Sequence, residues 1–121
     1  MIDTHSVEET IAVYKKYGWL LRRIMLTAPL KTRLGADVDG LFGGVSVTDS
    51  DIDAAWFSRS PKPGGIAWEL RHLSDSPFAL LKTLDETDDG FEDSLLVVES
   101  QLRERLANSN LLDKRPPRLQ T

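Results

Sequence analysis

The sequence predicts an α+β fold with a long N-terminal helix, a short helix, an antiparallel meander of three or four strands, and a C-terminal helix packed on the sheet. Helical periodicity opens and closes the chain, strand-forming runs separated by turn residues fill its middle, and strands do not alternate with helices. The chain has 121 residues, of which 40% are hydrophobic and 28% charged, as is typical of one globular domain. We expect this domain over residues 1–107 and a flexible tail over residues 108–121.

The first helix is expected over residues 6–27. Ser6 and Glu9 have the spacing of a capping box, in which the side chain of each residue accepts a hydrogen bond from the backbone N–H of the other. Apolar side chains recur at helical spacing from Val7 to Met25, so one face of this helix should be buried.

A second, short helix is expected over Leu30–Leu34. Pro29 suits its first turn because proline already has a helical φ angle, and Gly35 can end it in a left-handed conformation. Glycine and aspartate dominate residues 36–44, which therefore predict a loop, and a short strand could follow at residues 45–47.

Two aromatic-containing runs, Ala54–Ser60 and Ile66–Leu73, predict a hairpin with a connection rich in proline and glycine. Residues 78–85 predict a third antiparallel strand, which completes the meander. Two alternatives stay open: a short helix starting at Ser50, and a helical turn over residues 79–82.

The C-terminal helix is expected to enter through Asp88 or Asp89, whose carboxylates suit the positive end of a helix dipole. It should run for about four turns, because large apolar residues recur at helical spacing. The residues on its buried face are Phe91, Leu95, Val98, Leu102 and Leu106.

Charge and composition exclude several classes of function. Fifteen Lys and Arg against nineteen Asp and Glu give a net charge of -4, which disfavours binding to nucleic acid or to anionic lipid. With no cysteine and two histidines, the sequence predicts no disulfide, no metal site and no cofactor. No signal peptide or membrane span is recognised, so we expect a cytoplasmic protein, of bacterial origin.

The acidic residues come in two blocks, five acids over residues 37–58 and seven over residues 85–99, with no base in either. We interpret these blocks as solvated acidic loops at helix starts and sheet edges. The alternative is that the separation of charge orients two copies during self-association. Neither block fits a calcium-binding EF-hand: a loop starting at Asp85 has Leu96 at its twelfth position, and one starting at Asp49 has Ala54 at its sixth.

The sequence predicts no catalytic residues. Its glycine-rich segment over residues 35–44 has neither a phosphate-binding nor a dinucleotide-binding spacing, and no serine lies in a hydrolase motif. His72 is the one candidate base, and hairpin pairing could place it opposite Asp53, which we interpret as a surface pair rather than a catalytic dyad.

Two tryptophans are candidate contact residues. If Phe57 pairs near Trp68, the adjacent Trp56 lies on the other face of the sheet, where it is either covered by the C-terminal helix or exposed to a partner. Trp19 would lie on the polar face of the first helix among four cations, where it could pack locally, bind a ligand or anchor a partner. The cations are Lys15, Lys16, Arg22 and Arg23.

We therefore expect a non-catalytic interaction domain, a homodimeric adaptor or chaperone-like protein. Its candidate partner-binding residues are Lys15, Trp19, Arg22, Arg23, Trp56 and Arg71. The alternative is an enzyme or a protein that binds an anionic ligand in a pocket between sheet and helix, with Arg59, Glu69, Arg71 and His72 as candidate ligand-binding residues. A third possibility, nucleic-acid binding through the four cations around Trp19, is disfavoured by the net charge.

Overall fold

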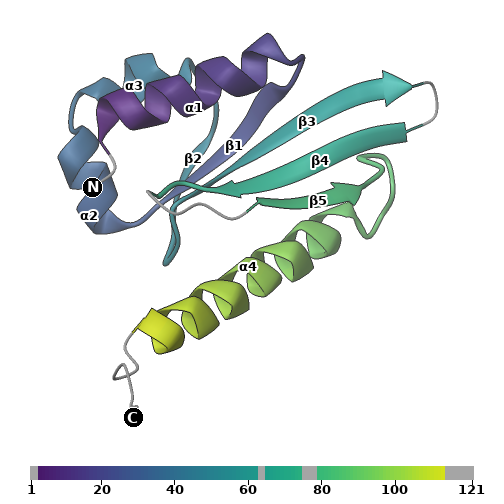
Figure 1. Ribbon diagram of the computed structural model, residues 1–121. Coiled ribbons are helices and arrows are strands. Elements are labelled where there is room, and N and C mark those ends of the chain that lie inside the picture. Colours follow the sequence, from purple (N-terminus) through teal and green to yellow (C-terminus); the bar gives the residue numbers. More distant parts are fainter. Residues whose placement is uncertain (1–2, 63–64, 75–78, 114–121) are drawn as a thin grey trace.

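The computed structural model describes residues 3–62, 65–74 and 79–113 and has the expected α+β architecture (Figure 1). The sequence of elements is α1 (Thr4–Lys16), β1 (Leu20–Leu26), α2 (Ala28–Leu34), α3 (Asp37–Phe42), β2 (Val47–Asp49), β3 (Ala54–Lys62), β4 (Gly65–His72), β5 (Ala79–Thr83) and α4 (Phe91–Asp113).

The strands form one sheet in the order β2-β1-β3-β4-β5. The predicted meander is present as β3, β4 and β5, each antiparallel to the next, and the helical alternatives at Ser50 and at residues 79–82 are wrong. The sheet is mixed rather than purely antiparallel because β2 runs parallel to β1. The sheet thus has five strands instead of three or four, since β1 comes from a segment predicted to be helical.

The long N-terminal helix is wrong in both length and cap. Helix α1 ends at Lys16, and its first turn is capped by Asp3, whose carboxylate accepts the backbone N–H of Ser6 at 2.9 Å. Gly18 then adopts a φ of +87°, and its N–H and that of Trp19 donate back to the last carbonyls of α1. This is a Schellman motif, which ends the helix and turns the chain into β1.

The second helix agrees with the prediction, whereas the predicted loop after it does not. Pro29 lies in the first turn of α2, and Gly35 follows its last residue with a φ of +56°. Six residues of the predicted loop, Asp37–Phe42, form the short helix α3. The loop was predicted from its glycine and aspartate content, but Phe42 is buried in the core and this packing holds the helical turn in place.

The hairpin of β3 and β4 is confirmed, but its predicted register is wrong by one residue. Phe57 lies opposite Glu69, and Trp56 lies opposite Leu70. Successive side chains of a strand point to opposite faces, so this shift places Trp56 on the same face as Trp68 rather than on the other one.

Helix α4 buries the predicted face, with Phe91, Leu95, Val98 and Leu102 in the core and Leu106 packed beside them. Its first residue is Phe91, and Asp88 accepts the backbone N–H of Gly90 just before it. The helix continues to Asp113, beyond the four turns expected, and residues 114–121 of the expected tail lie outside the described residues.

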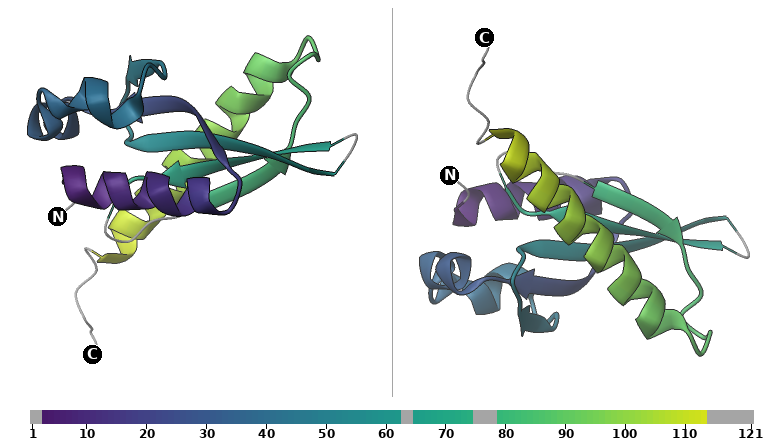
Figure 2. Two further views of the ribbon diagram at one scale, coloured as in Figure 1. Left: turned by 90° about the horizontal axis from the view of Figure 1, so that it is seen from above. Right: turned by 90° about the horizontal axis from the view of Figure 1, so that it is seen from below.

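The helices cover the two faces of the sheet as separate layers (Figure 2). Helices α1, α2 and α3 pack on one face over Ile24, Leu26, Ala55 and Phe57. Helix α4 crosses the other face over Ala54, Trp56, Trp68 and Leu70. The sheet therefore separates two hydrophobic cores, which explains why β3 is buried on both sides.

Candidate functional site

Trp19 lies in the turn between α1 and β1, not on the polar face of a helix. Its ring meets Tyr14 edge-on, with 6.0 Å between ring centroids, and the guanidinium of Arg59 stacks 4.7 Å from its ring centroid. Arg59 also donates a hydrogen bond of 3.0 Å to the carbonyl of Tyr17. Trp19 is therefore half-buried in local packing, on the face of the sheet that carries α1.

The predicted ring of four cations around Trp19 is wrong. The register of β1 shifts between Leu21 and Arg23, and both Arg22 and Arg23 turn to the face covered by α4. Arg22 pairs with Glu86 at 2.7 Å and lies 4.7 Å from the ring centroid of Trp68. Arg23 makes a two-pronged ion pair with Glu92, with contacts of 2.9 and 2.7 Å.

Lys15 and Lys16 therefore lie on the α1 side of the sheet, and the two arginines lie on the α4 side. Each arginine has its own carboxylate partner. The basic surface that nucleic-acid binding would have used is not assembled.

Three of the four candidate ligand-binding residues do come together, on the α1 face of the sheet. Glu69 accepts a hydrogen bond from the hydroxyl of Tyr14, and the guanidinium of Arg71 lies 5.7 Å from the Tyr14 ring centroid. Tyr14 itself stacks on Phe57 with 4.0 Å between centroids and 16° between ring planes. Burial, followed by the hydrogen bond to Glu69, raises the pKa of Tyr14 to about 12.

This Tyr14 cluster holds α1 against the sheet. The guanidinium groups of Arg59 and Arg71 lie against aromatic rings, and the carboxylate of Glu69 is engaged by the Tyr14 hydroxyl. The arginines are therefore engaged in helix-to-sheet packing, and Arg59 and Glu69 also line a pocket of about 300 Å³ beside Trp19.

His72 lies on the opposite face and forms no dyad with Asp53. The register pairs His72 with Ala54, and the Asp53 carboxylate accepts the backbone N–H and the hydroxyl of Thr27, at 2.7 and 3.2 Å. The Nδ1 atom of His72 lies 3.0 Å from the hydroxyl of Ser74. Burial lowers the pKa of His72, a shift that the charge of Asp53 opposes.

Trp56 is fully buried under α4, at 0% exposure, so the partner-binding role considered for it has no surface to act through. Its indole Nε1 donates a 2.9 Å hydrogen bond to Glu99, a carboxylate that is itself buried. Glu99 was missed because it belongs to an acidic block interpreted as solvated. Its spacing of four residues from Leu95 and three from Leu102 places it on the buried face, and this was the available signal.

Strand β5 forms one edge of the sheet and is exposed. It pairs with β4 on one side, and among the described strands none pairs with its other side. Four of its five residues are exposed, including Leu81 at 61%. A sheet edge with unpaired backbone groups and an exposed leucine is a template for pairing with another chain.

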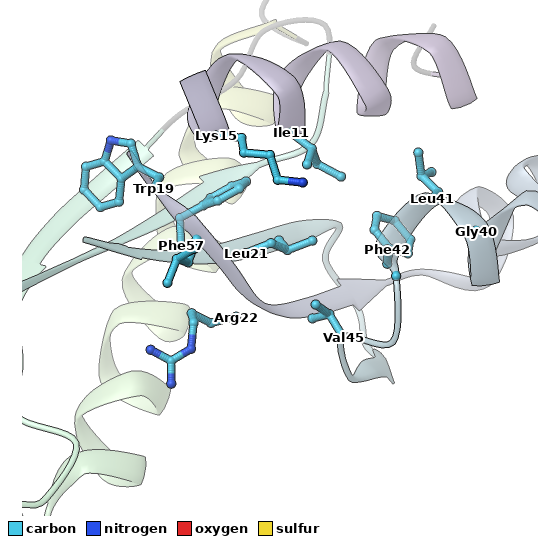
Figure 3. Close-up of a pocket in the computed structure, with 12 residues that line it drawn as sticks. Ile11, Lys15, Trp19, Leu21, Arg22, Gly40, Leu41, Phe42, Val45 and Phe57 are labelled. Atoms are coloured by element: carbon cyan, nitrogen blue, oxygen red, sulfur yellow. The ribbon is translucent and has the colours of Figure 1, made fainter. Parts of the chain in front are cut away.

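A groove of about 420 Å³ lies between α1, β1, α3 and the segment just after α3 (Figure 3). Its walls are mostly apolar, and they include Ile11, Leu21, Leu41, Phe42 and Val45. Lys15 and Trp19, two of the candidate partner-binding residues, line it as well.

A cluster of metal ligands and a membrane-spanning helix are both absent from the described part of the chain. Within residues 3–62, 65–74 and 79–113, no three acidic or histidine side chains gather as metal ligands would. No helix in these same ranges combines the length and the apolar character that crossing a bilayer requires. Comparisons of the chain with protein-family models, with curated proteins and with solved structures give no match.

Proposed function

We propose that this protein is a non-catalytic interaction domain, an adaptor- or chaperone-like protein that works as a homodimer joined along β5. The observation that carries the proposal is the outer edge of β5, which pairs with no other described strand and where Leu81 is exposed. Both faces of the central strands are covered by helices, so an edge is where the sheet can be extended. The two edge strands are β2 and β5, and β5 is the longer, with five residues against three.

The sequence of β5 suits antiparallel pairing with a second copy of itself. If the two-fold axis passes through Leu81, the two Leu81 side chains meet, and Ala79 lies opposite Thr83. Leu80 then lies opposite Lys82, whose aliphatic stem can cover it while the ammonium stays in water. No two like charges are directly opposed in this register, so electrostatic repulsion does not disfavour it.

The charged groups of the described residues also favour binding over catalysis. Arg22, Arg23 and Glu99 are committed to partners that stabilise the fold. His72 and Tyr14, whose pKa values are shifted, lie on opposite faces of the sheet and cannot act together on one substrate. With no cysteine, the chain has no disulfide that would need an oxidising compartment, which is compatible with the proposed cytoplasmic location.

Solution mass by light scattering tests the dimer. We expect wild-type protein to have twice the mass of one chain, and Leu81→Glu to have the mass of one chain because it places two carboxylates together at the axis. The control is Leu96→Glu, which changes a leucine that is 56% exposed on α4, a different surface. A monomeric wild type, or a dimer disrupted by Leu96→Glu but not by Leu81→Glu, would contradict the proposal.

A cross-linking experiment tests the register as well. Because the chain has no cysteine, a single Leu81→Cys substitution introduces the one thiol of the molecule. Oxidation should link two copies of Leu81→Cys through a disulfide, since the axis brings the two positions within bonding distance, and should leave Leu96→Cys unlinked. Equal cross-linking of both variants would argue against pairing along β5.

A further inference from the structure

The groove beside α1 combines apolar walls with one inward cation. The groove is lined by Ile11 from α1, Leu21 from β1, Leu41 and Phe42 from α3, and Phe57 from β3 (Figure 3). Its volume of about 420 Å³ falls within the usual range for small-molecule sites. The groove is on the face opposite α4, and β5 is not among the elements that form it.

Lys15 supplies the charge of this site. Figure 3 shows its side chain directed from α1 into the groove, with the amino group above Leu21. Among the described residues, no carboxylate forms an ion pair with Lys15. Arg22 also borders the groove, but its guanidinium is held by Ser58 at 2.9 Å and by Glu86 at 2.7 Å. One uncommitted positive charge therefore lies against an apolar surface.

We infer that this groove binds a small amphiphilic anion, an unbranched aliphatic carboxylate whose chain lies on the apolar walls and whose carboxylate pairs with Lys15. The apolar walls offer few hydrogen-bond donors for a polar ligand such as a sugar or a nucleotide. A single lysine matches a single negative charge, and because Lys15 is exposed, this ion pair adds to binding that the apolar walls supply in the main. This inference rests on α1 and α3 and is independent of the proposed dimer.

Decanoate is the probe we would use, kept below the concentration at which it forms micelles. Binding can be followed by titration calorimetry and by the fluorescence of Trp19, which lines the groove. We expect saturable binding of one decanoate per chain to the wild type. Decanol, which has the same chain and no charge, should bind about tenfold more weakly, because it lacks the charge-assisted contact.

The decisive comparison is Lys15→Met with Lys16→Met. Both remove one charge from the last turn of α1, but the Lys16 ammonium lies 5.9 Å from the ring centroid of Tyr17, and Lys16 does not line the groove. Lys15→Met should weaken decanoate binding about tenfold and leave decanol binding unchanged, whereas Lys16→Met should leave both unchanged. Leu41→Gln, which places an amide in the apolar wall, should weaken binding of both probes.

Several results would overturn the inference: no binding of decanoate to the wild type, equal losses in Lys15→Met and Lys16→Met, or decanol binding as tightly as decanoate. The Leu81→Glu variant separates this inference from the proposed function, because it should bind decanoate like the wild type. Decanoate binding without a dimer would uphold the groove and reject the β5 interface, and a dimer without decanoate binding would do the reverse.

Discussion

Individual polar side chains in this protein act mainly by joining layers. Glu99 of α4 accepts the indole N–H of Trp56, and Glu69 of β4 accepts the hydroxyl of Tyr14 from α1. Each contact satisfies a polar group that the neighbouring core would otherwise leave without a partner, which costs about 1–3 kcal/mol for a buried group. Polar residues at these positions therefore join each covering helix to its face of the sheet, beside the apolar contacts of the two cores.

His72 gives a prediction about pH. Its pKa is lowered from the ordinary value of 6.5 because burial disfavours the charged imidazolium. The unfolded chain thus binds a proton more readily than the folded chain, and the free energy of unfolding should fall as the pH drops below about 6.5. Urea titrations at pH 7.5 and 5.5 should show this fall in the wild type and a smaller one in His72→Gln.

The control for His72 is His5→Gln, since His5 is exposed on α1. This variant should keep the pH dependence of the wild type. If His5→Gln and His72→Gln changed it equally, burial of His72 would not be its source.

Among the structural elements, the turn from α1 into β1 has the largest effect on the fold, because it ends the helix and starts the strand. Gly18 adopts a φ of +87°, and Trp19 after it packs on Tyr14 within the last turn of α1. A Schellman motif places these two residues so that their N–H groups cap the helix. Because the chain reverses here, β1 enters the sheet between β2 and β3, and the groove forms beside α1.

Replacing Gly18 tests whether the positive φ angle at this position requires glycine. A Cβ at position 18 would meet nothing closer than 3.6 Å, so the cost of Gly18→Ala comes from the backbone angle and not from a clash. We expect a loss of about 1–2 kcal/mol in the free energy of unfolding, measured by urea denaturation.

Gly40→Ala is the matched control for Gly18→Ala. Gly40 lies inside α3, has no positive φ, and has open space around the added methyl. Alanine should raise the stability there by about 0.5–1 kcal/mol, because it restricts the unfolded chain and favours the helix. Equal destabilisation by the two variants would show that the conformation of Gly18 is not what matters.

The whole molecule consists of two cores that share one sheet. Alternate residues of β3 enter the two cores: Ala55 and Phe57 pack under α1, and Ala54 and Trp56 pack under α4. If β3 detaches from one core, the residues that it contributes to the other core are displaced as well. The molecule should therefore unfold as one cooperative unit.

Leu102→Ala tests this coupling. Leu102 is fully buried in the α4 core, so the substitution should cost about 2–5 kcal/mol. With fluorotryptophan labels, the NMR signals of Trp56 and Trp68 report on that core, and Trp19 reports on the other. All three signals should shift to the same lower urea midpoint.

For this experiment, Leu96→Ala, at an exposed position of α4, should stay within about 0.5 kcal/mol of the wild type. If Trp19 kept its wild-type midpoint in Leu102→Ala while the other two tryptophans shifted, the two cores would be unfolding independently.

Elements with local signals were predictable from the sequence. The limits of α2 follow from Pro29 and Gly35, the buried face of α4 follows from apolar spacing, and the β3–β4 hairpin follows from two strand-forming runs around a turn. Each of these depends on residues within a few positions of one another, so the information needed is contained in one segment.

The strand β1 and the contact sites depended on tertiary structure. The apolar spacing of Leu20–Leu26 fits a helix as well as a strand, and only pairing with β2 and β3 selects the strand. The strand register decides on which face of the sheet Trp56, Arg22 and Arg23 lie. A shift of one residue in the register moves each side chain to the opposite face.

The sequence alone therefore determined the α+β class, the meander and the apolar faces of its helices, because these arise from short-range periodicity and turn chemistry. The tertiary structure decided which residues meet across the sheet, where Lys15 points and which strands, β2 and β5, form the edges of the sheet. These features arise from contacts between segments far apart in the chain, and their energies depend on register and packing that no single segment encodes.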